Sequence, residues 1–146
     1  MGRVEAICIN RKKGTTKKPV DRARFIVDWG IEGDAHAGEG DRQVSLLAGE
    51  RIDQVRTVLP DLEEGAFAEN IIARHIQLSG IKVGDRLGLG DTVLLEITQI
   101  GKECHDSSCP IMKATGDCIM PREGLFARVL RGGMVIKGDA LWLSSM

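Results

Sequence analysis

Short apolar segments separated by glycine-rich turns account for most of the sequence. Residues 4–9 (VEAICI), 43–48 (QVSLLA) and 91–101 (DTVLLEITQIG) are rich in aliphatic and β-branched residues and have the length of buried strands. The chain contains 18 glycines, which is above average usage, and many of them flank these segments. The pattern predicts a protein built mainly from short strands.

Two further patterns refine this prediction. The segments VGDRLGLG (83–90) and IKGDALWLS (136–144) both read Gly-Asp-x-Leu-x-Leu, which predicts a turn followed by a half-buried strand. In GERIDQVRTVL (49–59) the apolar positions follow one helical face, so we expect a helix that Pro60 ends. The segments FAENIIARHIQL (67–78) and LFARVLRGGMVI (125–136) are compatible with either helix or strand.

Many short strands and one clear helix predict a mainly β fold, a closed or nearly closed β-barrel with a few short peripheral helices. An open α/β sheet would need strands that alternate with long helices, and the sequence has no such alternation. It also has no glycine-rich loop of the P-loop or dinucleotide-binding type. With 146 residues we expect a single domain, residues 1–146.

Composition narrows the classes of partner. The formal net charge is −1 and aromatic residues make up 3% of the chain, so neither a basic surface nor stacking platforms for nucleic acid are expected. No apolar run has the length of a membrane span, and the first residues do not resemble a signal peptide. We therefore expect a cytoplasmic protein with reduced thiols and with no nucleic-acid or membrane partner.

The run NRKKGTTKKPVDRAR (10–24) concentrates basic residues between two predicted strands. We interpret it as the solvated tip of a hairpin. The alternative is a flexible basic arm that contacts an anionic ligand.

The segment GIEGDAHAGEGDR (30–42) holds a second group of polar residues. Glu32, Asp34 and His36 are spaced two apart, so an extended backbone would direct all three side chains to one side. Such a group could bind a divalent metal or position a proton donor. The alternative is a polar loop in which Asp34 caps neighbouring amides and His36 lies at the rim. The glycines imply close approach of the backbone to the fold or to a ligand.

Three of the four cysteines, Cys104, Cys109 and Cys118, lie in IGKECHDSSCPIMKATGDCIMPREG (100–124). Their spacing lacks the two paired Cys-x₂₋₄-Cys knuckles of a typical structural zinc site, although zinc bound by the three cysteines remains an alternative. Cys104 follows the longest predicted strand and has Lys102 and His105 beside it, which favours a thiolate that acts as nucleophile or soft-metal ligand, whereas Glu103 and Asp106 oppose the thiolate. The alternative is an exposed surface thiol without a role. Cys8 lies in a predicted strand and is expected to be a buried, inert thiol.

Taken together, the segments resemble the MOSC family, which is named for the C-terminal domain of molybdenum cofactor sulfurase. The matching segments are GIEGDAHAG (30–38), FAENI (67–71), VGDRLGLG (83–90), the strand that leads to Cys104, and GLFARVLRGGMVIKGDAL (124–141). They follow in the order of the family and extend from about residue 30 to near the end of the chain. The resemblance implies a β-rich barrel of the MOSC or pyruvate-kinase-barrel type and an association with molybdenum cofactor (molybdopterin).

The resemblance also implies roles for particular residues. A cysteine after the long strand carries a sulfur atom destined for the cofactor or ligates molybdenum; Cys104 matches best, ahead of Cys118 and then Cys109. His105 and Lys102 would act beside that thiol. Asp34, His36, Glu69 and Asn70 match the family motifs and would line the cofactor pocket. We add Arg42, Arg122 and Arg128 as candidates for the pterin phosphate, because guanidinium groups suit bidentate phosphate binding.

The sequence therefore predicts a stand-alone MOSC protein of molybdenum-cofactor metabolism that binds the cofactor, carries sulfur as a persulfide for transfer, or does both. Cofactor sulfurases carry a pyridoxal-phosphate desulfurase domain that these residues lack, so we expect no pyridoxal phosphate on this chain. Sulfur would come from a donor such as a cysteine desulfurase, and the partners would be cofactor-biosynthesis proteins or molybdoenzymes. The alternatives are a zinc-stabilised, non-enzymatic binding domain and a small molybdenum-dependent reductase of N-hydroxylated compounds.

Overall fold

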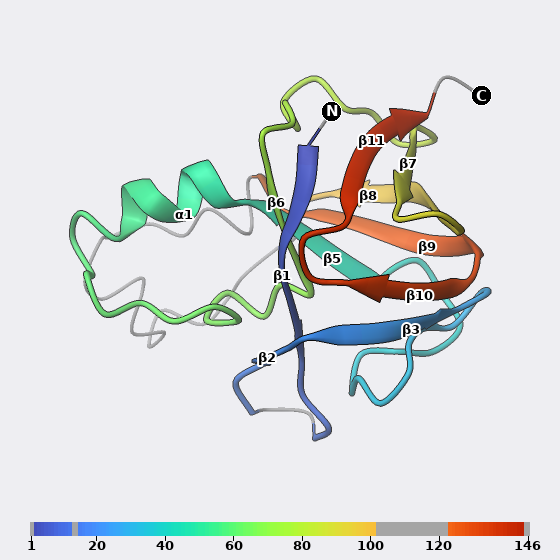
Figure 1. Ribbon diagram of the computed structural model, residues 1–146, viewed down its shortest axis with the longest axis horizontal. Helices are drawn as coiled ribbons and strands as arrows, with labels where there is room; N and C mark the ends of the chain where they lie inside the picture. The colour runs from blue at the N-terminus through green and yellow to red at the C-terminus, as the bar shows by residue number, and fades with distance from the viewer. Residues whose placement is uncertain (1, 13–14, 102–122, 145–146) are drawn as a thin grey trace.

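The computed structural model of the chain describes residues 2–12, 15–101 and 123–144 (Figure 1). The elements in chain order are β1 (Gly2–Ile9), β2 (Lys18–Val20), β3 (Arg22–Ile26), β4 (Gly30–Ile31), β5 (Val44–Ala48), α1 (Gly49–Val55), β6 (Ile71–Arg74), β7 (Arg86–Leu89), β8 (Val93–Ile100), β9 (Leu125–Arg131), β10 (Gly133–Ile136) and β11 (Ala140–Ser144). This part of the chain is dominated by strands, as the sequence pattern predicted.

The strands close into a barrel. The larger sheet has the order β11-β7-β8-β9-β5-β6-β1-β2, and an additional pairing between β1 and β11 joins its ends, so that seven strands form the wall and β2 extends from β1. All neighbours in the wall are antiparallel except β5 and β6, which are parallel and are joined through α1. A second sheet, with the order β10-β3-β4, lies against the barrel (Figure 1). The prediction of a mainly β, closed barrel is confirmed.

The two Gly-Asp-x-Leu-x-Leu segments pair with each other as β7 and β11. Leu87 lies opposite Leu143, and Leu89 lies opposite Leu141, whose side chain is fully buried. Between these pairs Gly88 faces Trp142, and a Cβ atom added at Gly88 would lie 2.4 Å from the indole ring. The absence of a side chain at Gly88 therefore lets the indole ring pack flat against the neighbouring strand.

Both segments with an ambiguous pattern contain strands. Residues 71–74 form β6, which pairs with β1 on one side and with β5 on the other. A strand in that position is buried on both faces, which explains why Ile71 and Ile72 are both buried and why the sequence shows no alternation. Residues 125–136 form β9 and β10. The helix over residues 49–59 is shorter than predicted: α1 ends at Val55, and turns continue to Leu59.

The apolar side chains form two clusters. The larger one fills the barrel, and the smaller one lies between the barrel wall and α1, where Ile52 packs with Phe67 and Phe126. Cys8 belongs to the smaller cluster and is fully buried, as predicted. Burial, helped by the negative charge of Glu69, raises the pKa of the Cys8 thiol to about 12, so Cys8 stays a protonated, unreactive thiol at neutral pH.

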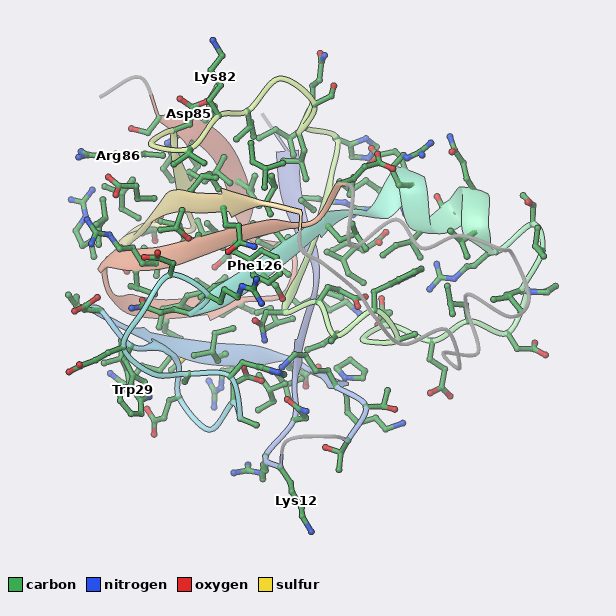
Figure 2. All side chains as sticks on the ribbon, turned by 180° about the vertical axis from the view of Figure 1, so that it is seen from behind. Lys12, Trp29, Lys82, Asp85, Arg86 and Phe126 are labelled. Atoms are coloured by element: carbon green, nitrogen blue, oxygen red, sulfur yellow. The ribbon has the colours of Figure 1, made fainter. Side chains whose placement is uncertain are left out.

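The basic run forms part of the hairpin that β1 and β2 make, and Lys12 extends from its tip away from the barrel (Figure 2). The interpretation as a hairpin tip is therefore correct for Lys12. It is wrong for Lys17, which is buried. In the described ranges, no helix is long and apolar enough to cross a membrane.

Candidate functional site

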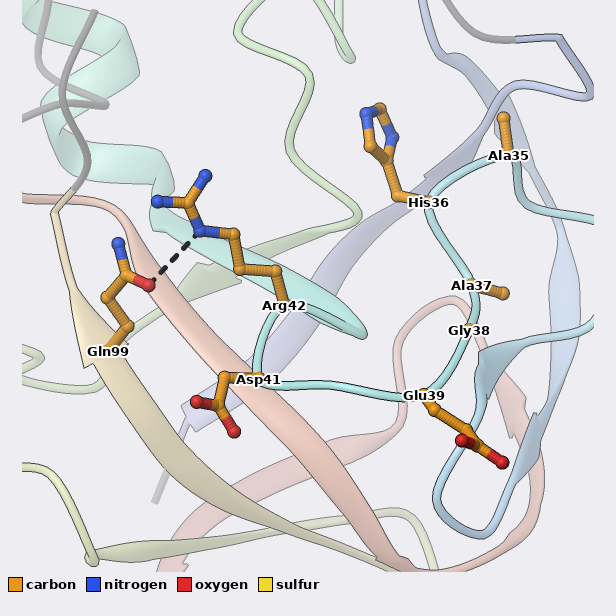
Figure 3. A pocket seen from close by; sticks show the side chains of 8 residues that line it. All are labelled: Ala35, His36, Ala37, Gly38, Glu39, Asp41, Arg42 and Gln99. Carbon is orange, nitrogen blue, oxygen red and sulfur yellow. Dashed lines mark hydrogen bonds between the residues drawn. The ribbon is translucent and has the colours of Figure 1, made fainter.

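A cavity of about 570 Å³ lies between the loop that joins β4 to β5 and the end of β8. Its volume falls within the usual range for small-molecule sites. Among the described residues, eight line it: Ala35, His36, Ala37, Gly38, Glu39, Asp41, Arg42 and Gln99 (Figure 3). We call this cavity the loop pocket.

Arg42 is held in place at the wall of the loop pocket. Its guanidinium carbon lies 5.3 Å from the centre of the Phe126 ring, and its Nε donates a hydrogen bond of 3.1 Å to Oε1 of Gln99. Gln99 in turn donates from Nε2 to the carbonyl oxygen of Gly101 at 2.8 Å. Stacking and hydrogen bonding together fix the plane of the guanidinium, which prepares it to bind an anion.

The loop itself is anchored at both ends by buried side chains. Near its start, Asp34 accepts hydrogen bonds through Oδ1 from the backbone N–H of Asn10 (3.1 Å) and through Oδ2 from the backbone N–H of His36 (3.3 Å). At its end, Gln43 donates to Oδ1 of Asp28 and accepts from the backbone N–H of Val129, both at 3.0 Å. The exposed residues between these anchors face the loop pocket.

A buried lysine supports the same loop. Lys17 is 1% exposed, and its Nζ lies 2.7 Å from Oδ1 of Asp34, 2.7 Å from Oδ1 of Asn10 and 2.9 Å from Nδ1 of His36. A buried charge is tolerated only when it is paired and hydrogen-bonded, and here both conditions are met. The ion pair places Asp34 behind the pocket, as a structural anchor for His36.

The extended backbone that would direct Glu32, Asp34 and His36 to one side does not form. Gly33 has a φ of +85°, and the amide of Asp34 bonds to the carbonyl of Ile31, so the backbone turns where the expectation required it to be extended. Glu32 then pairs with Arg24 on the surface at 3.5 Å, whereas Asp34 points inward. The alternative, in which Asp34 caps amides and His36 lies at the rim, describes the loop.

Glu69 and Asn70 lie next to each other in the chain but away from the lining of the loop pocket. Glu69 is fully buried and accepts hydrogen bonds from the backbone N–H groups of Gly65 (3.0 Å) and Phe67 (2.9 Å). Burial raises the pKa of the Glu69 carboxyl, although these backbone bonds oppose the shift. Both contacts are with the protein backbone, so the geometry gives Glu69 a role in shaping the segment before β6.

Arg128 also lies apart from the loop pocket. It is on β9, and its Nη2 lies 3.2 Å from Oε1 of Glu96 on β8; Glu96 is 3.7 Å from Arg86 on β7. These three side chains form a cross-strand row of charges on the outer face of the barrel. Of the three arginines considered for a phosphate, the described structure brings Arg42 to the pocket.

The remaining candidates fall outside the described residues: Lys102, Cys104, His105, Cys109, Cys118 and Arg122. The described chain stops at Gly101, directly after β8, and resumes at Glu123. Within residues 2–12, 15–101 and 123–144 there is no group of three histidine, cysteine or acidic side chains that could hold a metal ion.

Comparison with known proteins establishes the family. The model of the MOSC domain matches residues 33–142, which include the pocket loop and the strands from β5 to β10. The chain belongs to the MOSC domain family. A curated protein named "Reductase" from Gibberella moniliformis is 30% identical over 138 residues, which cover 87% of this MOSC chain and 25% of the reductase. The chain thus spans about a quarter of the length of that relative.

Solved structures show the same fold. The YUAD protein from Bacillus subtilis superimposes with a TM-score of 0.79 at 19% identity and covers 96% of this chain and 93% of its own. YiiM from Geobacillus stearothermophilus gives a TM-score of 0.72 at 18% identity, with 99% of this MOSC chain and 76% of the other chain covered. YiiM from Escherichia coli gives 0.65 at 22% identity, with 99% and 70% covered.

Three residues that build the pocket were not singled out from the sequence: Asn10, Lys17 and Gln99. Lys17 stands among other lysines, and nothing in the local pattern separates it from the exposed Lys18. A signal for Gln99 does exist in the sequence, because it is a polar residue at the end of the long strand that leads to Cys104. Functional side chains are often found where the strands of a rigid scaffold lead into loops.

Proposed function

We propose that this MOSC chain binds the molybdenum cofactor at the loop pocket and either carries sulfur to a metal–sulfur centre or holds molybdenum through a cysteine. The proposal rests on one observation above all: the fixed guanidinium of Arg42 and the ring of His36 line a cavity at the end of the strand that leads to Cys104. Membership of the MOSC family supplies the association with the cofactor.

The described side chains fit one end of this cofactor. Arg42 and His36 provide N–H donors, which suit the phosphate of a pterin. A cysteine thiolate is one protein group that could ligate molybdenum, and the buried, protonated thiol of Cys8 does not suit that role. Cys104 follows Gly101 by three residues, a stretch of chain that spans roughly 10 Å at most. The sequence position of Cys104 is therefore compatible with a place beside the pocket.

The roles of this chain's residues follow from their chemistry. When bound, the cofactor would supply a metal–sulfur centre that the protein itself lacks. Arg42 would bind the phosphate, and Gln99 would keep the guanidinium oriented. Lys102 and His105 would favour the thiolate form of Cys104, which is the form that accepts a sulfur atom or ligates a metal. Sulfur would come from a partner such as a cysteine desulfurase, and the acceptor would be a cofactor-biosynthesis protein or a molybdoenzyme of the cytoplasm.

The test is expression in a host that makes the cofactor, followed by molybdenum and pterin analysis of the purified chain. We expect both in the wild type and a loss of roughly tenfold or more in Arg42→Gln, because a charge-assisted contact is removed. Arg131→Gln, an exposed arginine at the end of β9, is the matched control. Wild-type protein free of pterin, even after reconstitution with isolated cofactor, would overturn the cofactor proposal.

The two possible uses of the cysteine are separated by mass spectrometry. After incubation with a cysteine desulfurase and cysteine, a sulfur carrier gains one sulfur atom on Cys104, and the gain disappears in Cys104→Ser but persists in Cys109→Ser. A molybdenum ligand instead shows loss of metal in Cys104→Ser without a persulfide in the wild type. If Cys118→Ser alone removes the signal, Cys118 takes the role assigned to Cys104.

A second candidate function is reduction of a substrate, favoured by the relative named "Reductase". This chain spans a quarter of that protein. The cofactor-loaded chain should then reduce an N-hydroxylated compound when a chemical reductant supplies the electrons. A zinc-stabilised binding domain would instead show about one zinc per chain and would unfold on chelation.

A further inference from the structure

The ammonium group of Lys17 has three hydrogens and no lone pair, so it can donate three hydrogen bonds and accept none. Its three neighbours are Oδ1 of Asn10 at 2.7 Å, Oδ1 of Asp34 at 2.7 Å and Nδ1 of His36 at 2.9 Å. Each hydrogen thus has one acceptor. The contact with His36 is satisfied only if Nδ1 carries a lone pair, which means that the hydrogen of the neutral ring is on Nε2.

We propose that Lys17 is a positioning residue that fixes His36 in the neutral form with its hydrogen on Nε2, so that the ring offers an N–H donor to an anionic oxygen bound in the loop pocket. The tautomer is argued from the contact between Nζ of Lys17 and Nδ1 of His36. The identity of the oxygen as part of a pterin phosphate rests on the proposed function.

The surroundings of His36 support this arrangement. Lys17 is buried, whereas His36 is exposed and lines the pocket, so the lysine contacts the ring from the side of the protein interior. The side chains of His36 and Arg42 extend to the same side of the loop, and the carboxylates of Glu39 and Asp41 extend to the other (Figure 3). Two donors therefore face one region, away from the acidic groups that would repel an anion.

The charges around the His36 ring also favour its neutral form. A hydrogen on Nδ1 would remove the third acceptor of Lys17 in either neutral or charged imidazole, and a ring with hydrogen on both nitrogens would also place a second cation beside a buried ammonium group. Asp34 does not compensate, because its Oδ1 is already bound to Lys17 and to the amide of Asn10, and its Oδ2 faces the backbone N–H of His36. Arg42, on the facing side of the loop, adds positive charge.

This assignment gives His36 a different chemistry from the one expected at first. A ring with Nδ1 bound to Lys17 and hydrogen on Nε2 has no lone pair to offer a metal ion or a proton in the pocket. His36 is therefore a hydrogen-bond donor rather than a metal ligand or a general base. Tautomers of histidine are fixed in this way by the hydrogen bond that the other ring nitrogen makes.

The test is nitrogen NMR of the histidine rings in the intact chain, with assignment by His36→Gln. We expect wild-type His36 to show a single neutral tautomer with hydrogen on Nε2 near neutral pH. In Lys17→Met the signal should become a mixture of tautomers. Lys18→Met is the matched control, because it removes the same charge from the next, exposed residue and should leave His36 unchanged. A wild-type ring with hydrogen on Nδ1, or a Lys17→Met ring identical to the wild type, would overturn the proposal.

Loss of Lys17 leaves Asp34 unpaired and buried, so Lys17→Met can unfold. In that event Lys17→Gln, which still donates from a neutral amide, replaces it, and a mixture of tautomers is again expected in the folded variant. The tautomer of the wild type remains decisive in either event.

The donor role is tested with inorganic phosphate as the probe. Phosphate should shift the Nε2 signal of wild-type His36, and His36→Leu should weaken phosphate binding by roughly tenfold or more, because a hydrogen bond to a charged group is lost. His36→Gln keeps an N–H donor and should recover part of the affinity. An unchanged Nε2 signal at saturating phosphate would refute the donor role. If the protein shows the expected tautomer and phosphate response but binds no pterin even after reconstitution with isolated cofactor, this inference stands and the proposed function is refuted.

Discussion

The side-chain amide of Asn70 donates a hydrogen bond of 3.0 Å to the backbone carbonyl of Cys8, and so connects the segment before β6 to β1. Its Oδ1 accepts from the backbone N–H of Ser45 at 3.0 Å and from the Ser45 hydroxyl at 3.2 Å. One buried side chain therefore bridges three neighbouring strand segments of the barrel wall.

Replacement of Asn70 by alanine should destabilise the fold by about 2–4 kcal/mol, because a buried carbonyl and a buried N–H lose their partner. Urea unfolding measures the change. Gln77→Ala, which alters an exposed amide, should have an effect below about 0.5 kcal/mol. Equal stability of Asn70→Ala and the wild type would show that the bridge does not support the barrel.

Glu69 should make stability depend on pH in an unusual direction. Its folded pKa is raised above the ordinary value of 4.5, so between these two values the folded chain binds more protons than the unfolded chain. The free energy of unfolding contributed by this group therefore falls as pH rises through that interval. Glu69→Gln does not titrate, so the advantage of the wild type over the variant in urea unfolding should shrink as pH rises above the ordinary value of 4.5. An advantage that grows with pH would contradict the raised pKa.

Gly88 and Trp142 should behave as a coupled pair. Gly88→Ala places a methyl group against the indole ring and should destabilise the barrel by about 1–3 kcal/mol. Trp142→Leu removes the ring, so alanine at position 88 should be far better tolerated in that background. Thermal or urea unfolding of both single variants and the double variant gives the coupling free energy. Strict additivity of the two changes would contradict the packing.

Arg74 should contribute more to the stability of the fold than other arginines at the surface. Its Nε lies 2.5 Å from Glu5 and its Nη1 lies 2.9 Å from Asp53, and these hydrogen bonds raise the pKa of the guanidinium. Arg74→Met should cost about 1–3 kcal/mol, since the partly buried Glu5 loses its partner. The hydrogen bond from Arg74 also lowers the pKa of Asp53, so the contribution of Asp53 to stability is present above its ordinary pKa and is lost as pH falls through the folded value.

The comparison for that variant is Arg86→Met, whose ion pair with Glu96 is longer and more exposed. We expect an effect below about 1 kcal/mol there. Unfolding of both variants from acidic to neutral pH checks the prediction. The difference between wild type and Arg74→Met should decrease at low pH, and a difference independent of pH would contradict the role of Asp53.

The barrel could be predicted from the sequence because its determinants are local and repeated. The strands β5, β8, β7 and β11 each show their own apolar pattern, and the glycine turns between them exclude long helices. Where β6 is buried on both faces, the alternation that marks a strand disappears, so residues 71–74 remained ambiguous until their partners were known.

The site was harder to predict from the sequence than the barrel, because the side chains that hold its loop in place are distant in the sequence. The motif around Asp34 and His36 lies in the loop that lines the pocket, and Arg42 stands at the end of that loop; the binding of a phosphate by Arg42 stays a prediction. The role of Asp34 depends on Lys17, which is 17 residues away and is buried by a hairpin that a basic run alone does not reveal. Tertiary contacts, rather than residue type, separate Lys17 from Lys18 and Glu32 from Asp34.

The pairing between β1 and β11 that closes the barrel consists of two residue pairs, Gly2 with Leu141 and Arg3 with Ala140. The two partners of each pair are about as far apart in the sequence as the described chain allows. Contacts between such distant residues form late in folding, because the entropy cost of closing a long loop must be met before these contacts stabilise the fold. We therefore expect β1 and β6 to assemble with β5 first and the barrel to complete only when β11 arrives. A ribosome-bound chain that lacks β11 would hold an open sheet whose unpaired β1 and β7 edges could recruit other chains.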